Sequence, residues 1–392
     1  MTDHGAENLD VFNRARQRFL EDVAAFELKE IGRDTAVVVV THLLSDRPVL
    51  LEVLGKHLEV RHVFGIPYST DRRVADWIDI RFPLTEASLE QLIEGSCIIE
   101  KLQAKDRKTV LVEIGGYSST RLNMDGSVPP SFCGVVEGTE SGTSAHRRFE
   151  PLNYPVVALS LSPTKAAESN LVGTGCLVST ARILRELGYS NELRTVCVLG
   201  FGRVGQSVAR ASRDAGFDVV VYDTSFDKRI QALGEGFRIP ERLDALKAGE
   251  IIFGATGVQS WTTQDLAAMQ SGAFLVSCSS KDVEFGFLGL RSEYGASKLS
   301  DAVHQVRVRG TTINILCEGT PVNFRDGASV GPLLTLLQAE LIGSCADLLL
   351  NRVQRGIHSP RDDLRQRVAA AWKGHYIDPV SGWYHNRFGT LI

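Results

Sequence analysis

The sequence predicts an α/β protein built from parallel sheets in more than one domain. First, its 392 residues exceed the roughly 100–200 residues of one domain, which favours two or three domains. Second, a share of 43% hydrophobic and 23% charged residues is typical of a folded chain, not of a disordered, collagenous or coiled-coil one. Third, short β-branched runs alternate with segments of helical spacing, which is the pattern of βα units.

Composition also excludes several kinds of partner. Lys+Arg 43 against Asp+Glu 47 leaves a net charge of −4, so there is no basic excess that would favour nucleic acid. No apolar run has the about 18–20 residues of a membrane span, and the polar start MTDHGAENLD is not a signal peptide. The seven cysteines are scattered without a C-x-x-C pair, which supports neither a disulfide framework nor structural zinc. We therefore expect a cytoplasmic protein with reduced thiols, no metal, and no membrane or nucleic-acid partner.

In the first 150 residues we expect one helix and then alternating strands and helices. The spacing of Phe12, Phe19, Val23 and Phe26 places these side chains on one face of an amphipathic helix. The other expected elements are strands at 36–40, 60–64, 96–100 and 109–114, a helix at 48–57, a strand-ending break at 65–67 and a loop at 118–130.

The second half carries the clearest pattern. An apolar stretch at 155–162 precedes a helix at 170–187. A strand at 195–199, a glycine-rich turn, a helix at 206–215 and a strand at 219–222 follow. Further strands are expected at 251–253, 274–277 and 312–316, before a long apolar helix at 331–350.

The glycine-rich turn has the spacing of a phosphate-binding loop. Gly200, Gly202 and Gly205 form G-x-G-x-x-G, with Arg203 and Val204 before the last glycine. The first glycine makes the tight turn, the second lets the backbone approach a pyrophosphate, and the third lets helix and strand pack closely. The N-terminus of the following helix attracts the phosphate charge.

Asp223 closes the strand that follows this turn. A carboxylate at this position accepts hydrogen bonds from the ribose hydroxyls of adenosine and repels a 2′-phosphate. The sequence therefore predicts a Rossmann domain that binds NAD rather than NADP.

Four further stretches flank this unit: Thr41-His42 with Asp46; Gly134-Val135-Val136-Glu137 through Gly142; Thr164-Lys165 through Asn170-Leu171 with Gly173; and Asn314 with Gly319 and Pro321. In their order and near spacing they resemble the S-adenosylhomocysteine hydrolase family. The resemblance implies a substrate and catalytic domain at 1–190, an NAD-binding domain at 191–330, and C-terminal helices at 331–392 that return to the substrate domain and form an oligomer interface.

The resemblance also implies a reaction. In that family, bound NAD oxidises the 3′-hydroxyl of a nucleoside to a ketone, which acidifies the neighbouring 4′-hydrogen. A base removes this hydrogen, the 5′ substituent leaves, water adds to the alkene, and the ketone is reduced again.

Residue roles follow by the same resemblance. Lys165 would handle the proton of the 3′-hydroxyl, with Asn170 beside it, and His42 would act as acid or base at the 5′ position. Asp46 would hold the amino group of adenine. The implied cofactor contacts outside the glycine turn are Thr139, Glu140, Ser141, Thr256, Gly257 and Asn314.

Several positions depart from the family pattern. The catalytic aspartate before the Gly-Gly pair is Ile114, and the second glutamate of the Glu-Glu-Thr-Thr-Thr-Gly run is Gly138. The aspartate beside the asparagine is Ser169, and the histidine before Pro321 is Thr320. We take Gly138, Ser169 and Thr320, together with Asp46, as the substrate-facing positions. The cofactor-binding positions follow the family pattern more closely than these do.

Three functions remain open. The first is a nucleoside lyase or dehydratase that uses the same oxidation and elimination, with Gly138 giving room for a larger sugar. The second is a genuine S-adenosylhomocysteine hydrolase, and the third a non-catalytic NAD-binding regulator.

The helix expected at 331–350 bears on assembly. Its leucines surround nearly the whole circumference, and a helix that is apolar all round must be buried on all sides. A second copy of the chain is the simplest source of the missing contact, so we expect a homo-oligomer, a dimer or a tetramer.

Overall fold

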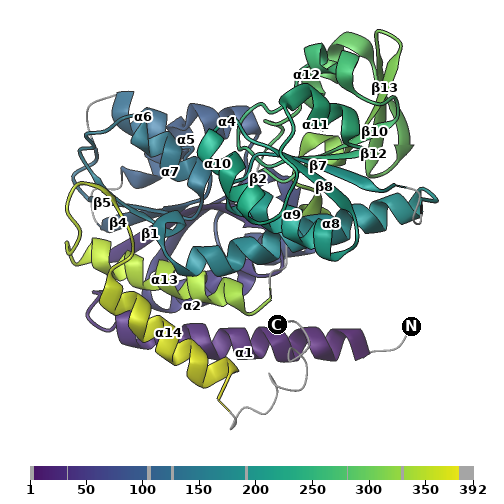
Figure 1. Ribbon diagram of the computed structural model, residues 1–392. Coiled ribbons are helices and arrows are strands. Elements are labelled where there is room, and N and C mark those ends of the chain that lie inside the picture. The colour runs from purple at the N-terminus through teal and green to yellow at the C-terminus, as the bar shows by residue number, and fades with distance from the viewer. Residues whose placement is uncertain are drawn as a thin grey trace. The chain divides into compact units, whose positions relative to one another are not determined.

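The computed structural model describes residues 4–378 except 33, 104–106, 125–127, 190–192, 280 and 328–330, and only the backbone of residues 4–13, so the side chain of Phe12 lies outside the described part. The chain divides into two compact units (Figure 1). Unit 1 comprises Met1–Lys165 and Gly331–Ile392, and unit 2 comprises Ala166–Val330. The second unit therefore begins well before the expected boundary at 191 and takes in nearly all of helix α8 (Thr164–Glu186).

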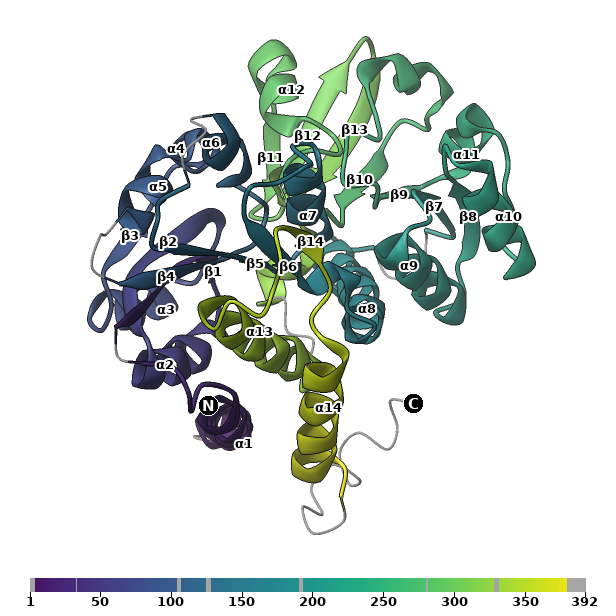
Figure 2. The same cartoon turned by 90° about the vertical axis from the view of Figure 1, so that its left-hand side faces the viewer.

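Unit 1 is built on a parallel seven-stranded sheet in the order β14-β6-β5-β4-β1-β2-β3. Its strands are β1 (Thr35–Leu43), β2 (Glu59–Thr70), β3 (Leu84–Glu86), β4 (Lys108–Glu113), β5 (Phe132–Glu137), β6 (Pro155–Ala158) and β14 (Gly356–His358). Strand β14 comes from the C-terminal segment and lies beside β6 (Figure 2). The parallel pairing and the buried valine runs of this sheet agree with the predicted α/β class.

The helices of unit 1 correct two sequence expectations. They are α1 (His4–Glu27), α2 (Arg47–His57), α3 (Arg72–Asp79), α4 (Leu89–Glu94), α5 (Ser96–Leu102), α6 (Ser119–Met124), α7 (Glu140–Arg147), the short η1 (Leu159–Leu161), α13 (Leu333–Leu349) and α14 (Asp362–Tyr376). The strand expected at 96–100 is helix α5, because Ile98, Ile99 and Leu102 bury a face of helical spacing. The loop expected at 118–130 contains α6, which buries Ser119 and Leu122.

Strand β2 does not end at residues 65–67 as expected. It continues to Thr70, but its register with β1 shifts there: Thr41 pairs with Gly65, and Leu43 pairs with Thr70. Residues 66–69 therefore bulge out of the ladder opposite His42.

Helix α13 is buried by its own chain. Every residue from Thr335 to Leu349 is buried, and the helix packs against α1, α14, β4 and β5. The apolar circumference therefore needs no second copy of the chain, and the argument from this helix to an oligomer was wrong. A homo-oligomer remains a prediction that rests on the family resemblance.

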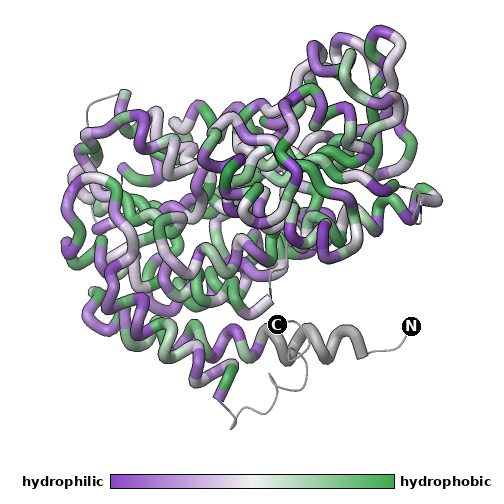
Figure 3. Tube along the Cα trace, viewed as in Figure 1, coloured by the Kyte–Doolittle hydropathy of each residue, from purple (hydrophilic) through white to green (hydrophobic). Residues whose placement is uncertain are grey.

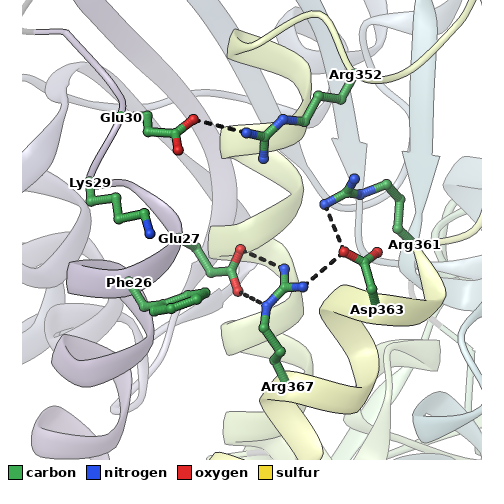
Figure 4. A pocket seen from close by; sticks show the side chains of 8 residues that line it. All are labelled: Phe26, Glu27, Lys29, Glu30, Arg352, Arg361, Asp363 and Arg367. Carbon is green, nitrogen blue, oxygen red and sulfur yellow. Dashed lines mark hydrogen bonds and ion pairs between the residues drawn. The ribbon is translucent and has the colours of Figure 1, made fainter.

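Ion pairs join the N-terminal and C-terminal helices of unit 1. Arg367 on α14 donates to both carboxylate oxygens of Glu27 on α1, at 2.8 and 3.0 Å, and to Asp363 at 2.8 Å. These groups line a surface pocket of about 310 Å³ (Figure 4), together with Phe26, Lys29, Glu30, Arg352 and Arg361. Because the carboxylate of Glu27 is buried, loss of its cationic partner costs more stability than loss of the partner of an exposed carboxylate.

Arg367→Ala should lower the free energy of unfolding by about 1–3 kcal/mol, because the buried carboxylate of Glu27 loses its bidentate donor. Urea unfolding followed by circular dichroism measures this. Arg73→Ala is the matched control, since the Arg73 side chain is 90% exposed and should change stability by less than about 0.5 kcal/mol. Equal effects of the two variants would contradict the structural role of Arg367.

Unit 2 has a second seven-stranded sheet, in the order β11-β12-β13-β10-β9-β7-β8. Its strands are β7 (Thr195–Leu199), β8 (Asp218–Tyr222), β9 (Ile251–Gly254), β10 (Ala273–Ser277), β11 (Ser297–Ser300), β12 (Val303–Val308) and β13 (Thr311–Leu316). Its other helical elements are α9 (Arg203–Asp214), α10 (Phe226–Gly234), α11 (Arg242–Ala248), η2 (Thr263–Ala268), α12 (Phe287–Tyr294), η3 (Cys317–Gly319) and η4 (Val322–Asp326).

All five strands predicted in unit 2 are confirmed, and hydrophobic colour follows the strands of both sheets (Figure 3). The antiparallel β11 and β12 were missed. Among the described residues, no helix is long and apolar enough to cross a membrane.

Candidate active site

Each sheet has a point where the strand order reverses, and ligands of open α/β sheets bind at the carboxyl ends of the strands there. In unit 2 the chain runs from β7 to β8 on one side and then to β9 on the other, so the reversal lies between β7 and β9. In unit 1 the corresponding point lies between β1 and β4. The candidate residues of each unit are described separately below.

The glycine turn at the end of β7 has the geometry of a pyrophosphate cradle. Gly200 has φ +95°, a conformation that favours glycine. A Cβ on Gly205 would lie 1.9 Å from the carbonyl oxygen of Gly200, so only glycine allows this close packing. A Cβ on Gly202 would meet nothing within 4 Å, which leaves open space at the N-terminus of α9. The turn therefore fits a dinucleotide phosphate, with the exposed Arg203 and half-buried Val204 in the first turn of the helix.

Asp223 lies next to this turn, as predicted. Its Oδ2 accepts the backbone N–H of Phe201 at 2.6 Å, and its Oδ1 accepts that of Ser225 at 2.8 Å. The carboxylate is thus held beside the glycine turn, where a negative charge disfavours a second phosphate on the ribose.

Asp223→Ala should weaken NAD binding and reduce the preference for NAD over NADP, because the charge that repels the 2′-phosphate is gone. We expect the ratio of the two dissociation constants to move toward one by at least about tenfold, which corresponds to roughly 1.4 kcal/mol. Calorimetric titration with both cofactors measures the ratio. Equal affinity of the unmodified protein for NAD and NADP would remove this role from Asp223.

A buried carboxylate joins the loops that follow β9 and β10. Glu284 is 0% exposed, and its Oε1 accepts the backbone N–H of Thr256 at 2.7 Å and of Gly257 at 2.8 Å. Its Oε2 accepts the hydroxyl of Thr256 at 2.8 Å, and the hydroxyl of Ser279 also donates to Oε1. Sequence reasoning proposed Thr256 and Gly257 for the cofactor but missed the glutamate that holds them, because it follows the next strand of the sheet and lies far from them along the chain.

The side chain of Asn314 forms two hydrogen bonds within the sheet region of unit 2. Its Nδ2 donates to the carbonyl oxygen of Gly272 at 2.8 Å, and its Oδ1 accepts from Gln305 at 3.1 Å. In the parallel ladder Asn314 pairs with Phe274, near the amino end of β10. A nicotinamide contact of Asn314 remains a prediction, and it would require these two hydrogen bonds to be replaced.

His42 lies on β1, close to its carboxyl end. Its Nδ1 is in hydrogen-bond contact with the hydroxyl of Ser69, and its ring contacts Tyr68 edge-on at 6.1 Å between centroids. Burial of the ring and the nearby Arg47 cation lower the pKa of His42 to about 3, so the imidazole is neutral at neutral pH. His42 must therefore accept a proton before it can donate one.

Asp46 is only 6% exposed, at the turn before α2. It accepts from Nε2 of Gln338 on α13 at 2.8 Å and forms an ion pair with Arg47 at 3.2 Å. The carboxylate is thus tied to the C-terminal segment of the chain, a contact that sequence reasoning could not foresee. Its role toward a nucleobase stays a prediction.

Glu137, at the end of β5, organises the strand-end loops of unit 1 as Glu284 does in unit 2. It accepts backbone N–H groups of Gly115 at 3.2 Å, Gly116 at 3.0 Å and Thr139 at 2.7 Å. Burial and the neighbouring Glu113 raise the pKa of Glu137 to about 7.

Thr139, which was predicted to contact the cofactor, also donates its hydroxyl to Glu137 at 2.6 Å and caps α7 by accepting from the N–H of Gly142. Glu140 and Ser141 are exposed in the first turn of that helix.

Glu113, Glu137 and His146 form the cluster of metal-ligand type among the described residues. Glu113 accepts from His146 at 2.9 Å and from the hydroxyl and N–H of Ser118 at 2.6 and 3.1 Å. Both oxygens of both carboxylates thus already accept hydrogen bonds, which makes this a structural network rather than a vacant ligand set.

The space expected beside Gly138 is filled. A Cβ on Gly138 would come within 2.7 Å of Cγ2 of Ile114. The Ile114 side chain therefore occupies the space that a side chain at position 138 would need. The two departures from the family pattern thus compensate each other sterically. That Gly138 gives room for a larger sugar stays a prediction, and the contact with Ile114 does not favour it.

The remaining candidates lie along α8 and after β13. Lys165 is half-buried in the first turn of α8 and belongs to unit 1. Asn170 has an exposed side chain in unit 2, where its carbonyl oxygen accepts the hydroxyl of Ser207, and the neighbouring Ser169 is buried. Thr320 is half-buried and donates its hydroxyl to the carbonyl oxygen of Cys317 at 2.6 Å.

Comparison with known proteins supports the NAD-binding assignment. Residues 191–329 match the model of the S-adenosyl-L-homocysteine hydrolase NAD-binding domain. S-inosyl-L-homocysteine hydrolase from Methanopyrus kandleri is 28% identical over 386 residues, which covers 94% of this chain and 88% of that protein. The predicted resemblance to adenosylhomocysteinases is thus confirmed as a similarity at modest identity, strongest in the NAD-binding unit. The cofactor of this chain is NAD.

The alignments differ in extent between two groups of relatives. S-inosyl-L-homocysteine hydrolase from Methanosarcina acetivorans is 25% identical over 77% of this chain and 75% of its own length. Adenosylhomocysteinase from Sulfolobus acidocaldarius is 28% identical over 199 residues, about half the length of each chain. This adenosylhomocysteinase-like chain thus aligns with the inosyl-type hydrolases through both of its units.

Proposed function

We propose that this chain is an NAD-dependent hydrolase of a purine nucleoside that carries a 5′-thioether, with S-inosyl-L-homocysteine as the first substrate to test. The observation that carries the proposal is the alignment with S-inosyl-L-homocysteine hydrolases, which extends through both units instead of stopping at the NAD-binding one.

Unit 2 supplies the redox half of the proposed reaction. The glycine turn at 200–205 would hold the pyrophosphate, and Asp223 the adenosine ribose, while Glu284 would fix the loop with Thr256 and Gly257. NAD held by these residues would supply a hydride acceptor for the 3′-carbon of the substrate and a hydride donor for the final reduction.

Unit 1 supplies the proton-transfer half. Lys165 would take the proton of the 3′-hydroxyl as the ketone forms, and the family resemblance gives Asn170 an assisting role. His42, which is neutral, would accept the proton of the water that adds to the alkene. Homocysteine would leave as its thiolate and take up a proton from solvent, and His42 would return its proton to solvent at the end of the cycle.

The lyase or dehydratase function remains a second candidate because the family's strand-end aspartate is Ile114 here. An apolar side chain at that place could leave the alkene without an activated water. The contact of Ile114 with the space beside Gly138, however, does not favour a larger sugar there.

The test is incubation of the purified protein with S-inosyl-L-homocysteine, S-adenosyl-L-homocysteine, inosine and adenosine. We expect homocysteine release from the inosyl thioether, measured with a thiol reagent, and transient NADH absorbance. Mass spectrometry of the products separates added water (hydrolase) from an unsaturated nucleoside (lyase). If none of the four substrates causes NADH to form, the proposal is contradicted.

A further inference from the structure

Helix α13 carries two buried carboxylates in a mainly apolar sequence. Glu340 is 0% exposed and Asp347 is 3% exposed. Burial of a carboxylate costs free energy unless the group is paired or hydrogen-bonded. Asp347 is paired with Arg361 at 3.0 Å. Glu340 instead contacts the segment that leads into α8, so its side chain connects two parts of the chain that are far apart in the sequence.

The carboxylate of Glu340 holds the first turn of α8. Its Oε1 accepts the hydroxyl of Thr164, the first residue of that helix, at 2.8 Å. The hydroxyl of Thr164 also lies 2.8 Å from that of Ser162, which is 1% exposed. Burial raises the pKa of Glu340, and the hydroxyls of Ser162 and Thr164 and the cation of Arg365 on α14 oppose this rise. The start of α8 is thus tied to α13 within unit 1.

Lys165 follows Thr164 directly, so this tie acts next to it. The backbone N–H of Lys165 donates to the carbonyl oxygen of Ser162 at 3.1 Å. Lys165 is also the last residue of unit 1 before the chain enters unit 2 at Ala166. An anchor at Thr164 therefore fixes the backbone of Lys165 to unit 1 at the point where α8 leaves that unit. The anchor acts on the backbone of the turn, so it is independent of the contacts that the Lys165 side chain itself makes.

We propose that Glu340 is a positioning residue for Lys165: through the hydroxyl of Thr164 it fixes the turn from which Lys165 reaches the 3′-hydroxyl of the substrate. The catalytic part of this inference rests on the proposed function, whereas the anchoring of the turn does not. A general base must lie within hydrogen-bond reach of the proton that it takes. A displacement of this turn by about 1 Å therefore lowers the rate even though the lysine is still present.

The anchor is measured by hydrogen–deuterium exchange of the peptide that spans residues 162–170. Thr164→Val removes the hydroxyl donor and keeps the shape of the side chain, and we expect these amides to exchange about five- to tenfold faster. Thr109→Val is the matched control: the hydroxyl of Thr109 also makes two hydrogen bonds, to the carbonyl oxygen of Arg107 at 3.1 Å and from Arg61 at 2.9 Å, but it lies at the amino end of β4. Unchanged exchange in Thr164→Val, or equal acceleration in Thr109→Val, would overturn the anchor.

A double-mutant cycle separates positioning from a general loss of stability. Thr164→Val should lower kcat for the thioether substrate about tenfold with KM nearly unchanged, and Thr164→Ser, which keeps the donor, should recover most of the rate. In the Lys165→Ala background, Thr164→Val should lower the remaining rate less than about twofold, because the group that it positions is gone. An equal loss in both backgrounds, or an unaltered rate in Thr164→Val, would overturn the positioning role.

Glu340 itself is tested by the same two measurements. Glu340→Gln keeps an acceptor for Thr164 and should stay within about threefold of the unmodified protein, whereas Glu340→Leu has no acceptor and should match Thr164→Val. Unaltered exchange and rate in Glu340→Leu would contradict the inference, and Thr164→Val keeps it testable if Glu340→Leu does not fold. If exchange accelerates as expected but the unmodified protein turns over no nucleoside, the proposed function fails and the anchor stands. If turnover is normal and exchange is unchanged in Thr164→Val, the anchor fails alone.

Discussion

Replacing Lys165 by alanine should lower the rate of substrate-driven NAD reduction by about 10²–10⁴-fold while the protein keeps its NAD. Lys165 lies in the first turn of α8, and in the proposed reaction it takes the proton that leaves the 3′-hydroxyl as hydride departs. Without it the hydroxyl proton has to pass to water, which is a poor base at neutral pH. Single-turnover absorbance of NADH after mixing with the thioether substrate measures the rate.

Two comparisons make this result specific to the ammonium group. NAD content, measured after denaturation, should equal that of the unmodified protein, because none of the glycine turn has changed. Lys298→Ala removes an exposed lysine from β11, 58% exposed, and should leave the rate unaltered. A loss of less than about tenfold in Lys165→Ala would take Lys165 out of the catalytic set.

Glu284→Leu should weaken NAD binding more than about tenfold and lower the free energy of unfolding by about 1–3 kcal/mol. The substitution removes the acceptor of the Thr256 N–H group and of the Ser279 hydroxyl, and it leaves the Gly257 N–H group only the hydroxyl oxygen of Ser279, at 3.1 Å. Thr256 and Gly257 are exposed, so water replaces part of the lost hydrogen bonding there. The loop that follows β9 then loses its fixed position beside the cofactor.

The amide variant separates hydrogen bonding from charge. In Glu284→Gln one oxygen can still accept from Thr256, Gly257 and Ser279, and the Thr256 hydroxyl can turn toward the carbonyl oxygen of Val258, 2.8 Å away. We expect NAD affinity within about threefold of the unmodified protein and a much smaller loss of stability. Urea unfolding and calorimetric titration with NAD measure both variants. If both variants bind NAD equally well, Glu284 does not position the loop.

Local pattern was sufficient for the NAD-binding unit. The G-x-G-x-x-G spacing, the apolar run before it and Asp223 after the next strand all lie within one short stretch of sequence, and their geometry follows from short-range backbone rules. The structure places Gly200, Gly205 and Asp223 as those rules require. The antiparallel β11 and β12 were missed because short, half-exposed strands have weak alternation.

Unit 1 was harder to predict because its contacts join distant parts of the chain. The burial of α13 is decided by α14, which follows it closely, and by α1, which comes from the opposite end of the sequence. The fit of Ile114 against Gly138 is a contact between two strand ends, and a sequence shows only that both positions changed. The break expected at 65–67 was a real signal, but it marks a bulge within β2 and not its end, and the residue that the bulge delivers, Ser69, carried no signal of its own.

The division of unit 1 between both ends of the chain sets the order in which the protein can fold during synthesis. Unit 2 is one continuous stretch, and all its strands are available once residue 330 has been made. Unit 1 lacks its buried helix α13 and its edge strand β14 until the segment after residue 330 emerges. The apolar surfaces of α1, β4 and β5 that α13 covers are therefore exposed to the ribosome exit and to chaperones for the whole time that unit 2 is being translated, although unit 1 begins first.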